Sequence, residues 1–172
     1  MQRIMIVGQP GSGKSTLARE LGRRAGLPVV HIDHIHWMPG WVERPRDEKT
    51  RLCLEAEARE RWIFEGGHSA TWASRLARAD LLIWLDLPLA LRFRRVLGRT
   101  LRWHGQTRPD LPEGCPEGLG RETLAFWRFI WRTRDSARDG IARLVAGSAK
   151  PVVRLQSPAE VARFLADWPA AE

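Results

Sequence analysis

The sequence predicts an α/β fold: a single domain with a five-stranded parallel sheet, helices on both faces and a small flap. Three observations carry this prediction. Short apolar runs alternate with segments of helical spacing along the chain. One run, residues 81–85, is apolar throughout, as is typical of a strand in the middle of a parallel sheet. A glycine-rich loop lies between the first apolar run and the first helical segment.

The glycine-rich loop fits the pattern G-x-x-x-x-G-K-[ST] of the phosphate-binding loop, or P-loop. Glycines let backbone N–H groups turn toward phosphate oxygens, and the helix N-terminus adds partial positive charge. We expect Lys14 to reach the β- and γ-phosphates of a nucleotide and Ser15 to ligate Mg²⁺. The pattern therefore predicts a P-loop NTPase, with its triphosphate site formed by Gly8, Pro10, Gly11, Ser12, Gly13, Lys14 and Ser15.

The other elements follow in order. Apolar runs predict strands at residues 4–7, 29–32, 62–64, 81–85 and 151–155. Helical spacing predicts helices at residues 16–21, 47–61, 70–79, 88–103 and 117–146, the last with a break near Asp135 or Gly140. Ser157 is expected to cap a final helix with Pro158 at its first position. Residues 39–45 are predicted as loop, and the Gly- and Pro-rich stretch at about 103–118 as a lid or flap.

The composition is that of a soluble globular protein, with 44% hydrophobic and 28% charged residues. No apolar run approaches the length of a membrane span, and the first strand begins so near Met1 that we expect no secretory signal. Cys53 and Cys115 have no metal or redox spacing and are expected to be free thiols. These features predict a cytoplasmic protein without a membrane partner.

The net charge of +8 comes almost wholly from arginine, since Lys14, Lys49 and Lys150 are the only lysines. Three interpretations stay open: nucleic-acid binding, arginines gathered around a polyphosphate, and genomic codon bias. The polyphosphate interpretation is favoured over nucleic acid, because Arg binds phosphate in a bidentate manner.

Arginines line one face of the helix expected at residues 88–103. Arg92, Arg95, Arg99 and Arg102 follow at steps of three, four and three, so they share a face that leads into the flap. Four like charges repel unless something anionic lies beside them, which favours a phosphoryl-binding role over a solvent-facing surface. Four arginines that follow the flap are candidates for the wall of the site where the chain returns from the flap: Arg128, Arg132, Arg134 and Arg138.

The next three strands each end beside an acidic residue: Asp33, Glu65 and Asp86. Ligands bind at the carboxyl ends of parallel strands, so these acids are candidates for the site. Asp33 is predicted to position the acceptor or take its hydroxyl proton, with a turn or cap as the alternative. Glu65 and Asp86 are candidates for Mg²⁺. For Asp86, a cap of the helix that begins at Pro88 is slightly favoured.

Three histidines, His31, His34 and His36, surround Asp33 on a segment expected to be extended. Zinc binding is the weaker interpretation, because no Cys or distant His pair supports it. We expect His34 and His36 to line the acceptor pocket or pack beside it. Trp37 and Trp41 either stack on a base or sugar or, as is commoner, pack in the protein.

Several nucleotide-binding classes are excluded by what the sequence lacks. It contains no Asn, so the N-K-x-D motif for guanine cannot occur, and no D-x-x-G switch motif is present. No G-x-G-x-x-G follows the first strand, and the H-R-D motif of protein kinases is absent. These absences favour an adenine nucleotide.

Together these motifs resemble the adenylate-kinase-like small kinases, and among them the bacterial proteins called DNA topology modulation proteins. The resemblance covers nearly the whole chain and rests on the P-loop and on residues 31–33, 39–41, 62–66, 84–88, 107–110 and 114–117. It implies ATP with Mg²⁺ and phosphoryl transfer to a small acceptor. By motif position it implies ATP contacts from Gly13, Lys14, Ser15 and Thr16, with Arg92, Arg95 and Arg99 at the base of the flap.

We therefore predict an ATP-dependent small kinase. The residues predicted for catalysis are Lys14, Asp33, Arg95, Arg99 and Arg138; Arg92 is predicted for the nucleotide, and Ser15, Glu65 and Asp86 for Mg²⁺. The acceptor is either a nucleoside monophosphate or a hydroxyl metabolite, and only the hydroxyl needs Asp33 as a base. The alternative function is a nucleotide-dependent nucleic-acid-binding or regulatory ATPase.

Overall fold

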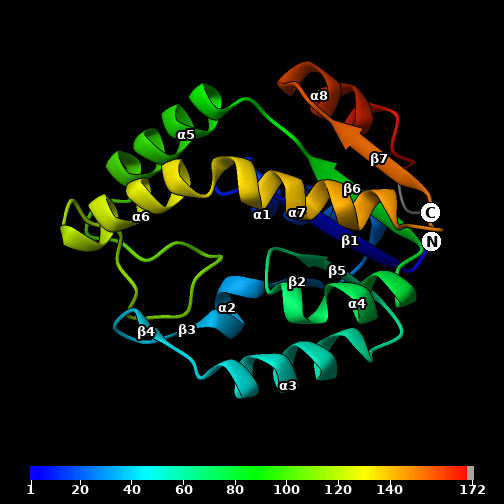
Figure 1. Ribbon diagram of the computed structural model, residues 1–172, viewed down its shortest axis with the longest axis horizontal. Coiled ribbons are helices and arrows are strands. Elements are labelled where there is room, and N and C mark those ends of the chain that lie inside the picture. The colour runs from blue at the N-terminus through cyan, green and yellow to red at the C-terminus, as the bar shows by residue number, and fades with distance from the viewer. Residues whose placement is uncertain (170–172) are drawn as a thin grey trace.

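The computed structural model describes residues 1–169 and contains a five-stranded parallel sheet in the order β2–β5–β1–β6–β7 (Figure 1). The strands are β1 (Arg3–Gly8), β2 (Val29–His31), β5 (Trp62–Glu65), β6 (Leu81–Leu85) and β7 (Val152–Leu155). The central strand β1 pairs with β5 on one side and β6 on the other. All five predicted strands are present, and the predicted fold class is confirmed.

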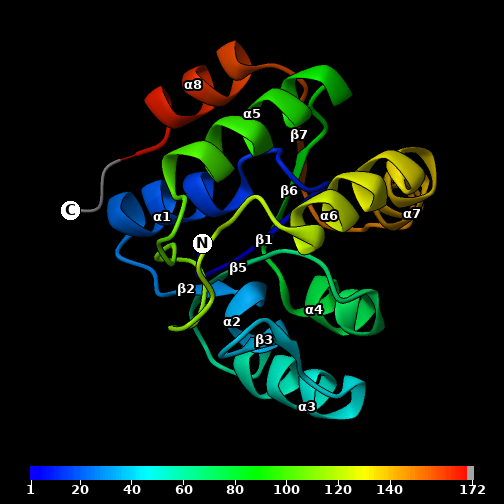
Figure 2. The same cartoon turned by 90° about the vertical axis from the view of Figure 1, so that its left-hand side faces the viewer.

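Helices cover both faces of the sheet (Figure 2). The side chains of β1 alternate between the faces, because successive residues of a strand point to opposite sides. Ile4 and Ile6 pack with the face covered by α1 (Lys14–Ala25) and α8 (Pro158–Ala166). Met5 and Val7 pack with the face covered by α3 (Arg46–Glu57), α4 (Trp72–Arg78) and α7 (Arg134–Ala146). The two apolar clusters fix the sheet between its helices.

The segment after β2 differs from the prediction. The strand ends at His31, and a short helix α2 (Ile32–His36) follows in place of an extended histidine segment. The predicted loop at residues 39–45 contains the turn and the second strand of an antiparallel hairpin, formed by β3 (Trp37–Met38) and β4 (Val42–Glu43). Strands of two residues are too short to give a periodic pattern, so the sequence could not indicate them.

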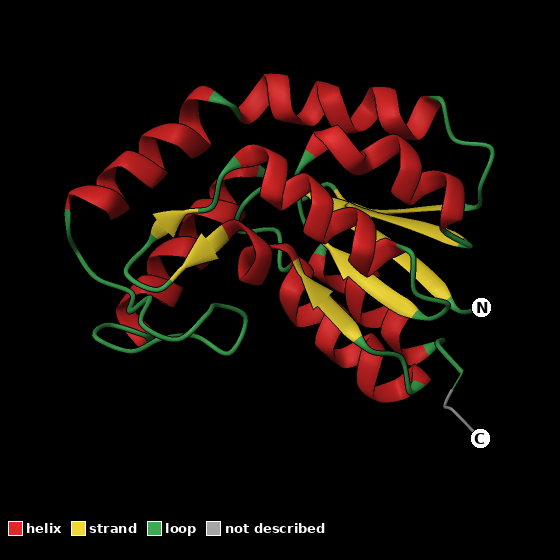
Figure 3. Ribbon diagram, turned by 90° about the horizontal axis from the view of Figure 1, so that it is seen from below, coloured by secondary structure: helices red, strands yellow, loops and turns green. Residues whose placement is uncertain are grey.

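The helical stretch predicted at residues 117–146, with a break near Asp135 or Gly140, is two helices. Thr133 separates helix α6 (Arg121–Arg132) from α7, so the break lies close to the predicted position at Asp135, and Figure 3 shows it. The Thr133 hydroxyl donates to the Phe129 carbonyl at 2.7 Å, a contact that competes with helix continuation. Helix α5 (Leu89–Arg102) and α6 extend beyond the sheet, on the side where the flap lies (Figure 1).

The flap between α5 and α6 has no helix or regular strand. Two isolated bridges, His104 with Glu117 and Thr107 with Pro116, hold its two arms together. Within the described residues, no helix is both long and apolar enough to cross a membrane.

The turn after β5 is fixed from two sides. Gly66 has φ 111°, and a Cβ on it would lie 2.1 Å from Cγ2 of Ile32. Arg75 of α4 is fully buried and donates from Nη1 to the carbonyls of Gly66 and Gly67, at 3.4 and 3.3 Å. Its guanidinium also lies 3.6 Å from the ring centroid of Phe64. This turn sets the position of the neighbouring Glu65.

We expect Gly66→Ala to lower the free energy of unfolding by more than about 2 kcal/mol, because the new Cβ meets Ile32 and the backbone is left-handed. Gly67→Ala is the matched control, since a Cβ there meets nothing within 4 Å. Chemical denaturation of both variants measures the difference. Equal losses would contradict the assigned role of the contact with Ile32.

Candidate active site

The P-loop joins β1 to α1 and packs against α5. Gly11 and Gly13 have φ of 77° and 94°, a backbone region that favours glycine. A Cβ on Gly11 would lie 2.6 Å from the carbonyl oxygen of Arg92 and 2.9 Å from Cγ2 of Val96. The loop glycines are therefore required both by backbone conformation and by the close approach of α5.

The basic face of α5 is turned in part toward the P-loop. Arg92 is only 3% exposed, and Arg95 and Arg99 are half-buried, whereas Arg102 is exposed, as are Leu97 and Leu101 at 42% and 57%. Arg92 donates from Nη1 to the Pro10 carbonyl at 3.4 Å, and Arg95 donates from Nη1 to the Ser12 carbonyl at 2.9 Å. Arg92 and Arg95 are thus brought to the P-loop, whereas Arg102 lies on the solvent-exposed surface.

Lys14 lies at the N-terminus of α1, where its Nζ donates to the Gln9 carbonyl at 3.2 Å. Burial lowers its pKa, while the carboxylates of Glu65 and Asp33 act in the opposite direction. The ammonium therefore lies in a desolvated position that lacks a full counter-charge, as a phosphate-binding lysine requires.

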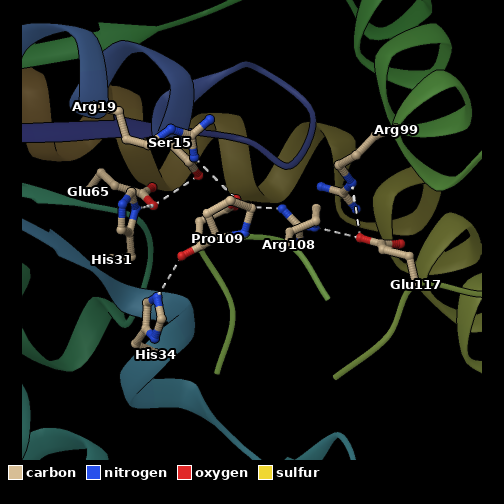
Figure 4. Close-up of polar contacts among 10 residues, drawn as sticks. Ser15, Arg19, His31, His34, Glu65, Arg99, Arg108, Pro109 and Glu117 are labelled. Carbon is tan, nitrogen blue, oxygen red and sulfur yellow. Dashed lines mark hydrogen bonds and ion pairs between the residues drawn. The ribbon is translucent and has the colours of Figure 1, made fainter. Parts of the chain in front are cut away.

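Glu65 connects three elements. Its Oε1 accepts a hydrogen bond from the Ser15 hydroxyl at 3.0 Å and lies 2.8 Å from Nδ1 of His31 (Figure 4). The carboxylate is 2% exposed. A buried carboxylate is stable only when it is hydrogen-bonded, and these two partners, from α1 and β2, satisfy that condition.

Asp33 lies on α2 and is half-buried. Burial raises the pKa of its carboxyl, and the Glu65 carboxylate raises it further, while Arg108 and Lys14 act in the opposite direction. A raised pKa is typical of a carboxylate that takes up a proton during reaction. The structure thus brings Lys14, Ser15, Asp33 and Glu65, four of the predicted residues, to one end of the sheet.

The flap supplies charged residues that the sequence analysis did not assign to the site. Arg108 contacts Asp110 at 2.6 Å and Glu117 at 2.7 Å, and all three are buried. Arg99 of α5 lies 3.3 Å from Glu117, and Arg19 of α1 lies 3.2 Å from Asp110 (Figure 4). The one sequence signal for these residues is that they are charges in a flap with few other core residues.

The flap also contacts the elements after β2. The Pro109 carbonyl lies 3.2 Å from Nε2 of His34, and the Trp41 indole N–H donates to the Pro116 carbonyl at 2.9 Å. The Gly40 N–H donates to the Gly114 carbonyl at 2.9 Å. The flap therefore bridges the P-loop helix α1 and the α2–hairpin region, and Trp41 is bound to the flap.

The histidines have separate partners. His31 contacts Glu65, His34 contacts the flap, and the ring of His36 stands edge-on to Trp37 with centroids 4.5 Å apart. Among the side chains that the structure describes, no group of three His, Cys, Asp or Glu is placed to hold a metal ion.

Asp86 and Arg138 differ from their predicted roles. Asp86 makes no cap of α5, whose N-terminal position is Pro88 without a side-chain cap. Its two oxygens accept from Nε and Nη2 of Arg138 at 2.8 and 2.9 Å, and Arg154 contacts it at 2.5 Å. The two guanidinium groups bind both carboxylate oxygens of Asp86, which a Mg²⁺ ion would need as ligands. The same ion pair ties Arg138 to the end of β6 instead of the flap, because α7 crosses the sheet there.

Residues 4–108 match the family model described as an AAA domain. The chain belongs to this family. Cytidylate kinase of Pyrobaculum aerophilum is 35% identical over 141 residues, which span 74% of this chain and 72% of the relative. Shikimate kinase of Paracidovorax citrulli is 31% identical over 136 residues, or 69% of this chain and 71% of the relative.

Solved structures agree with this AAA-domain fold. Deoxyadenosine kinase from M. mycoides with bound dATP superposes with a TM-score of 0.57, at 13% identity over 96% of this chain and 98% of that one. Shikimate kinase from Acinetobacter baumannii in complex with shikimate gives 0.56, at 17% identity over 96% and 91%.

The kinase relatives confirm the predicted activity class. This AAA-domain protein is a P-loop phosphotransferase, a small kinase that transfers the γ-phosphoryl group of ATP to a small acceptor.

The ion pairs of Asp86 predict a pH-dependent contribution to stability. Burial raises the pKa of Asp86, but hydrogen bonds from Arg138 and Arg154 outweigh it and leave the pKa below its ordinary value. A lowered folded pKa stabilises the folded state above the unfolded value of about 3.9, and this contribution is lost as the pH falls through the folded value.

We expect Asp86→Asn to lower the free energy of unfolding by about 1–2 kcal/mol at neutral pH, with the difference from wild type vanishing at low pH. Asp135→Asn, which removes an exposed pair with Arg134, is the control and is expected to have little effect. Denaturation at several pH values tests this. A loss that is independent of pH would contradict the ion-pair account.

Proposed function

We propose that the chain transfers the γ-phosphoryl group of ATP to a hydroxyl group of its acceptor, with Asp33 as the base. The observation that carries the proposal is the half-buried carboxyl of Asp33 on α2, whose pKa is raised and which lies close enough to the P-loop lysine for each charge to affect the other's pKa. A phosphate acceptor is already ionised and needs no base, whereas a hydroxyl must lose its proton during attack.

Lys14 and the backbone N–H groups of the P-loop, from Gly8 through Gly13 to Thr16, would hold the ATP phosphates. Mg²⁺ would be held by Ser15 and Glu65, and it would neutralise charge on the β- and γ-phosphates. Their fit is supported by the chemistry of the pair, a hydroxyl and a carboxylate 3.0 Å apart, because Mg²⁺ prefers oxygen ligands and retains several waters.

Four arginines would act on the phosphates of ATP in two ways. Arg92 and Arg95, bound to the carbonyls of Pro10 and Ser12, would shape the P-loop and attract the triphosphate. Arg99 and the flap residue Arg108 would stabilise charge that develops on the transferring group. Their ion pairs with Glu117 support this, because those pairs keep both guanidinium groups beside the site until ATP binds.

The flap supports a finer family placement, which we propose on the residues of the resemblance. Residues 107–110 and 114–117 make the contacts with α1, α2 and the β3–β4 hairpin. Their position at the site is what a family-specific segment would need, and it favours a relationship to the bacterial DNA topology modulation proteins.

Mg²⁺–ATP is expected to raise the melting temperature of the wild type, because a ligand that binds only the folded state stabilises it. Lys14→Met should abolish most of this shift, since it removes the cation that meets the phosphates. Lys150→Met, before β7, is the control and should keep the shift. Thermal denaturation measures all three. An unchanged shift in Lys14→Met would remove Lys14 from the ATP site.

We expect Asp33→Asn to lower kcat by about 10²- to 10⁴-fold, the range of general base catalysis, while the thermal shift with Mg²⁺–ATP persists. Because the base must be ionised and its pKa is raised, wild-type kcat should fall with decreasing pH already above the ordinary Asp value of about 3.9. Asp47→Asn, an exposed carboxylate of α3, is the control. Near-full turnover in Asp33→Asn would contradict the assignment of Asp33 as the base.

A further inference from the structure

We propose that the acceptor is an uncharged hydroxyl compound, and not an acid or a phosphate ester. This inference rests on the proposed function, the transfer of a phosphoryl group to a hydroxyl. The observation behind it is the charge balance of the site when the flap covers it.

Eight ionisable side chains line the flap and the site below it, apart from Arg92 and Arg95, which contact carbonyls of the P-loop. Four are cationic: Lys14, Arg19, Arg99 and Arg108. Four are carboxylates: Asp33, Glu65, Asp110 and Glu117. The charges of the two groups cancel before any ligand binds, so the cluster holds no surplus positive charge for an anion.

The arginines of the cluster already have carboxylate partners. Arg108 contacts both Asp110 and Glu117, Arg19 contacts Asp110, and Arg99 contacts Glu117, with distances from 2.6 to 3.3 Å. In the proposed reaction Arg99 and Arg108 also serve the transferring phosphoryl group. A carboxylate or phosphate on the acceptor would therefore have to compete for them both with that group and with the buried carboxylates.

The flap itself brings more negative than positive charge to the site. Of its buried ionisable residues, Arg108 is cationic, whereas Asp110 and Glu117 are anionic. On the opposite side, Asp33 and Glu65 approach the acceptor position from α2 and β5. An anionic acceptor would therefore meet carboxylates from the flap and from the sheet.

The two arginines outside this cluster face the nucleotide. Arg92 and Arg95 contact the P-loop carbonyls of Pro10 and Ser12. Mg²⁺–ATP is anionic and draws on these cations, so they are not available to an acceptor. A neutral acceptor leaves the balance of the closed site unchanged.

The chemistry balances with a neutral hydroxyl. The hydroxyl oxygen forms a bond to the γ-phosphorus, and the bond from that phosphorus to the β,γ-bridging oxygen breaks. ADP leaves with the electron pair, and the hydroxyl proton passes to Asp33. The product carries a new phosphate ester. Its negative charge opposes Glu65, and also Asp33 once that carboxyl has released the proton, which favours release.

The test compares matched pairs of acceptors in an ADP-release assay with Mg²⁺–ATP. Suitable pairs are cytidine with cytidine monophosphate, deoxyadenosine with its monophosphate, and the methyl ester of shikimate with shikimate. We expect kcat/KM for the neutral member to exceed that for the anionic member by about tenfold or more. Preferred turnover of an anionic member would overturn the inference and leave the kinase assignment intact.

A binding measurement decides the matter even if no member of the panel is turned over. With saturating Mg²⁺ and a non-hydrolysable ATP analogue, added inorganic phosphate at constant ionic strength should give no further thermal shift. A phosphate-dependent shift would reveal an anion site for the acceptor and would overturn the inference. Absence of any shift with the analogue itself would instead refute the proposed function.

Asp110→Asn tests the role of the flap. Removing this carboxylate should raise the ratio of anionic to neutral turnover, or give a phosphate-dependent shift, by freeing Arg19 and Arg108. Glu113→Gln removes an exposed flap carboxylate and should leave both readouts unchanged. The ratio is measured within one variant, so a folding defect does not move it. An unchanged ratio in Asp110→Asn would contradict the charge argument.

Discussion

The carboxylate of Glu65 is the point on which the site depends. It ends β5, which lies between the edge strand β2 and the central strand β1, is almost fully buried, and joins Ser15 of α1 to His31 of β2. A buried charge of this kind must be hydrogen-bonded, so it holds the P-loop helix and the edge strand in a fixed relation. Gly66 and Arg75 fix the turn behind it, so its position is set by packing as well as by its partners.

The orientation of α5 also serves the site. Arg92 is buried and Arg95 is half-buried, and the cost of burying these guanidinium groups is offset because they donate to carbonyls of the P-loop. Arg92 and Arg95 bring positive charge to the P-loop, and the loop stays rigid because Gly11 packs directly on the backbone of α5. Preorganised positive charge of this sort is what phosphoryl transfer uses.

The flap covers the site and is held there by ion pairs instead of apolar contacts. Its carboxylates neutralise the arginines of α1 and α5, and its backbone meets His34, Gly40 and Trp41. Matched charges keep the covered site neutral, and the same matching makes the site selective by charge. The kinase relatives indicate the transfer reaction, whereas the features that we propose to distinguish acceptors lie in the flap.

The sequence by itself determined the P-loop and the five strands, because these depend on local patterns: glycine spacing, apolar runs and helix periodicity. The kinase class followed from the resemblance of its motifs to the adenylate-kinase-like kinases. The sequence also indicated Asp33 and Glu65, since strand ends converge at one edge of a parallel sheet. Only the tertiary structure decided that Asp86 binds Arg138 and Arg154, that Arg92 and Arg95 contact P-loop carbonyls, and that Arg108 and Asp110 enter the site. These outcomes depend on which distant segments meet, and a pairing between residues far apart in the chain leaves no periodic pattern in one sequence.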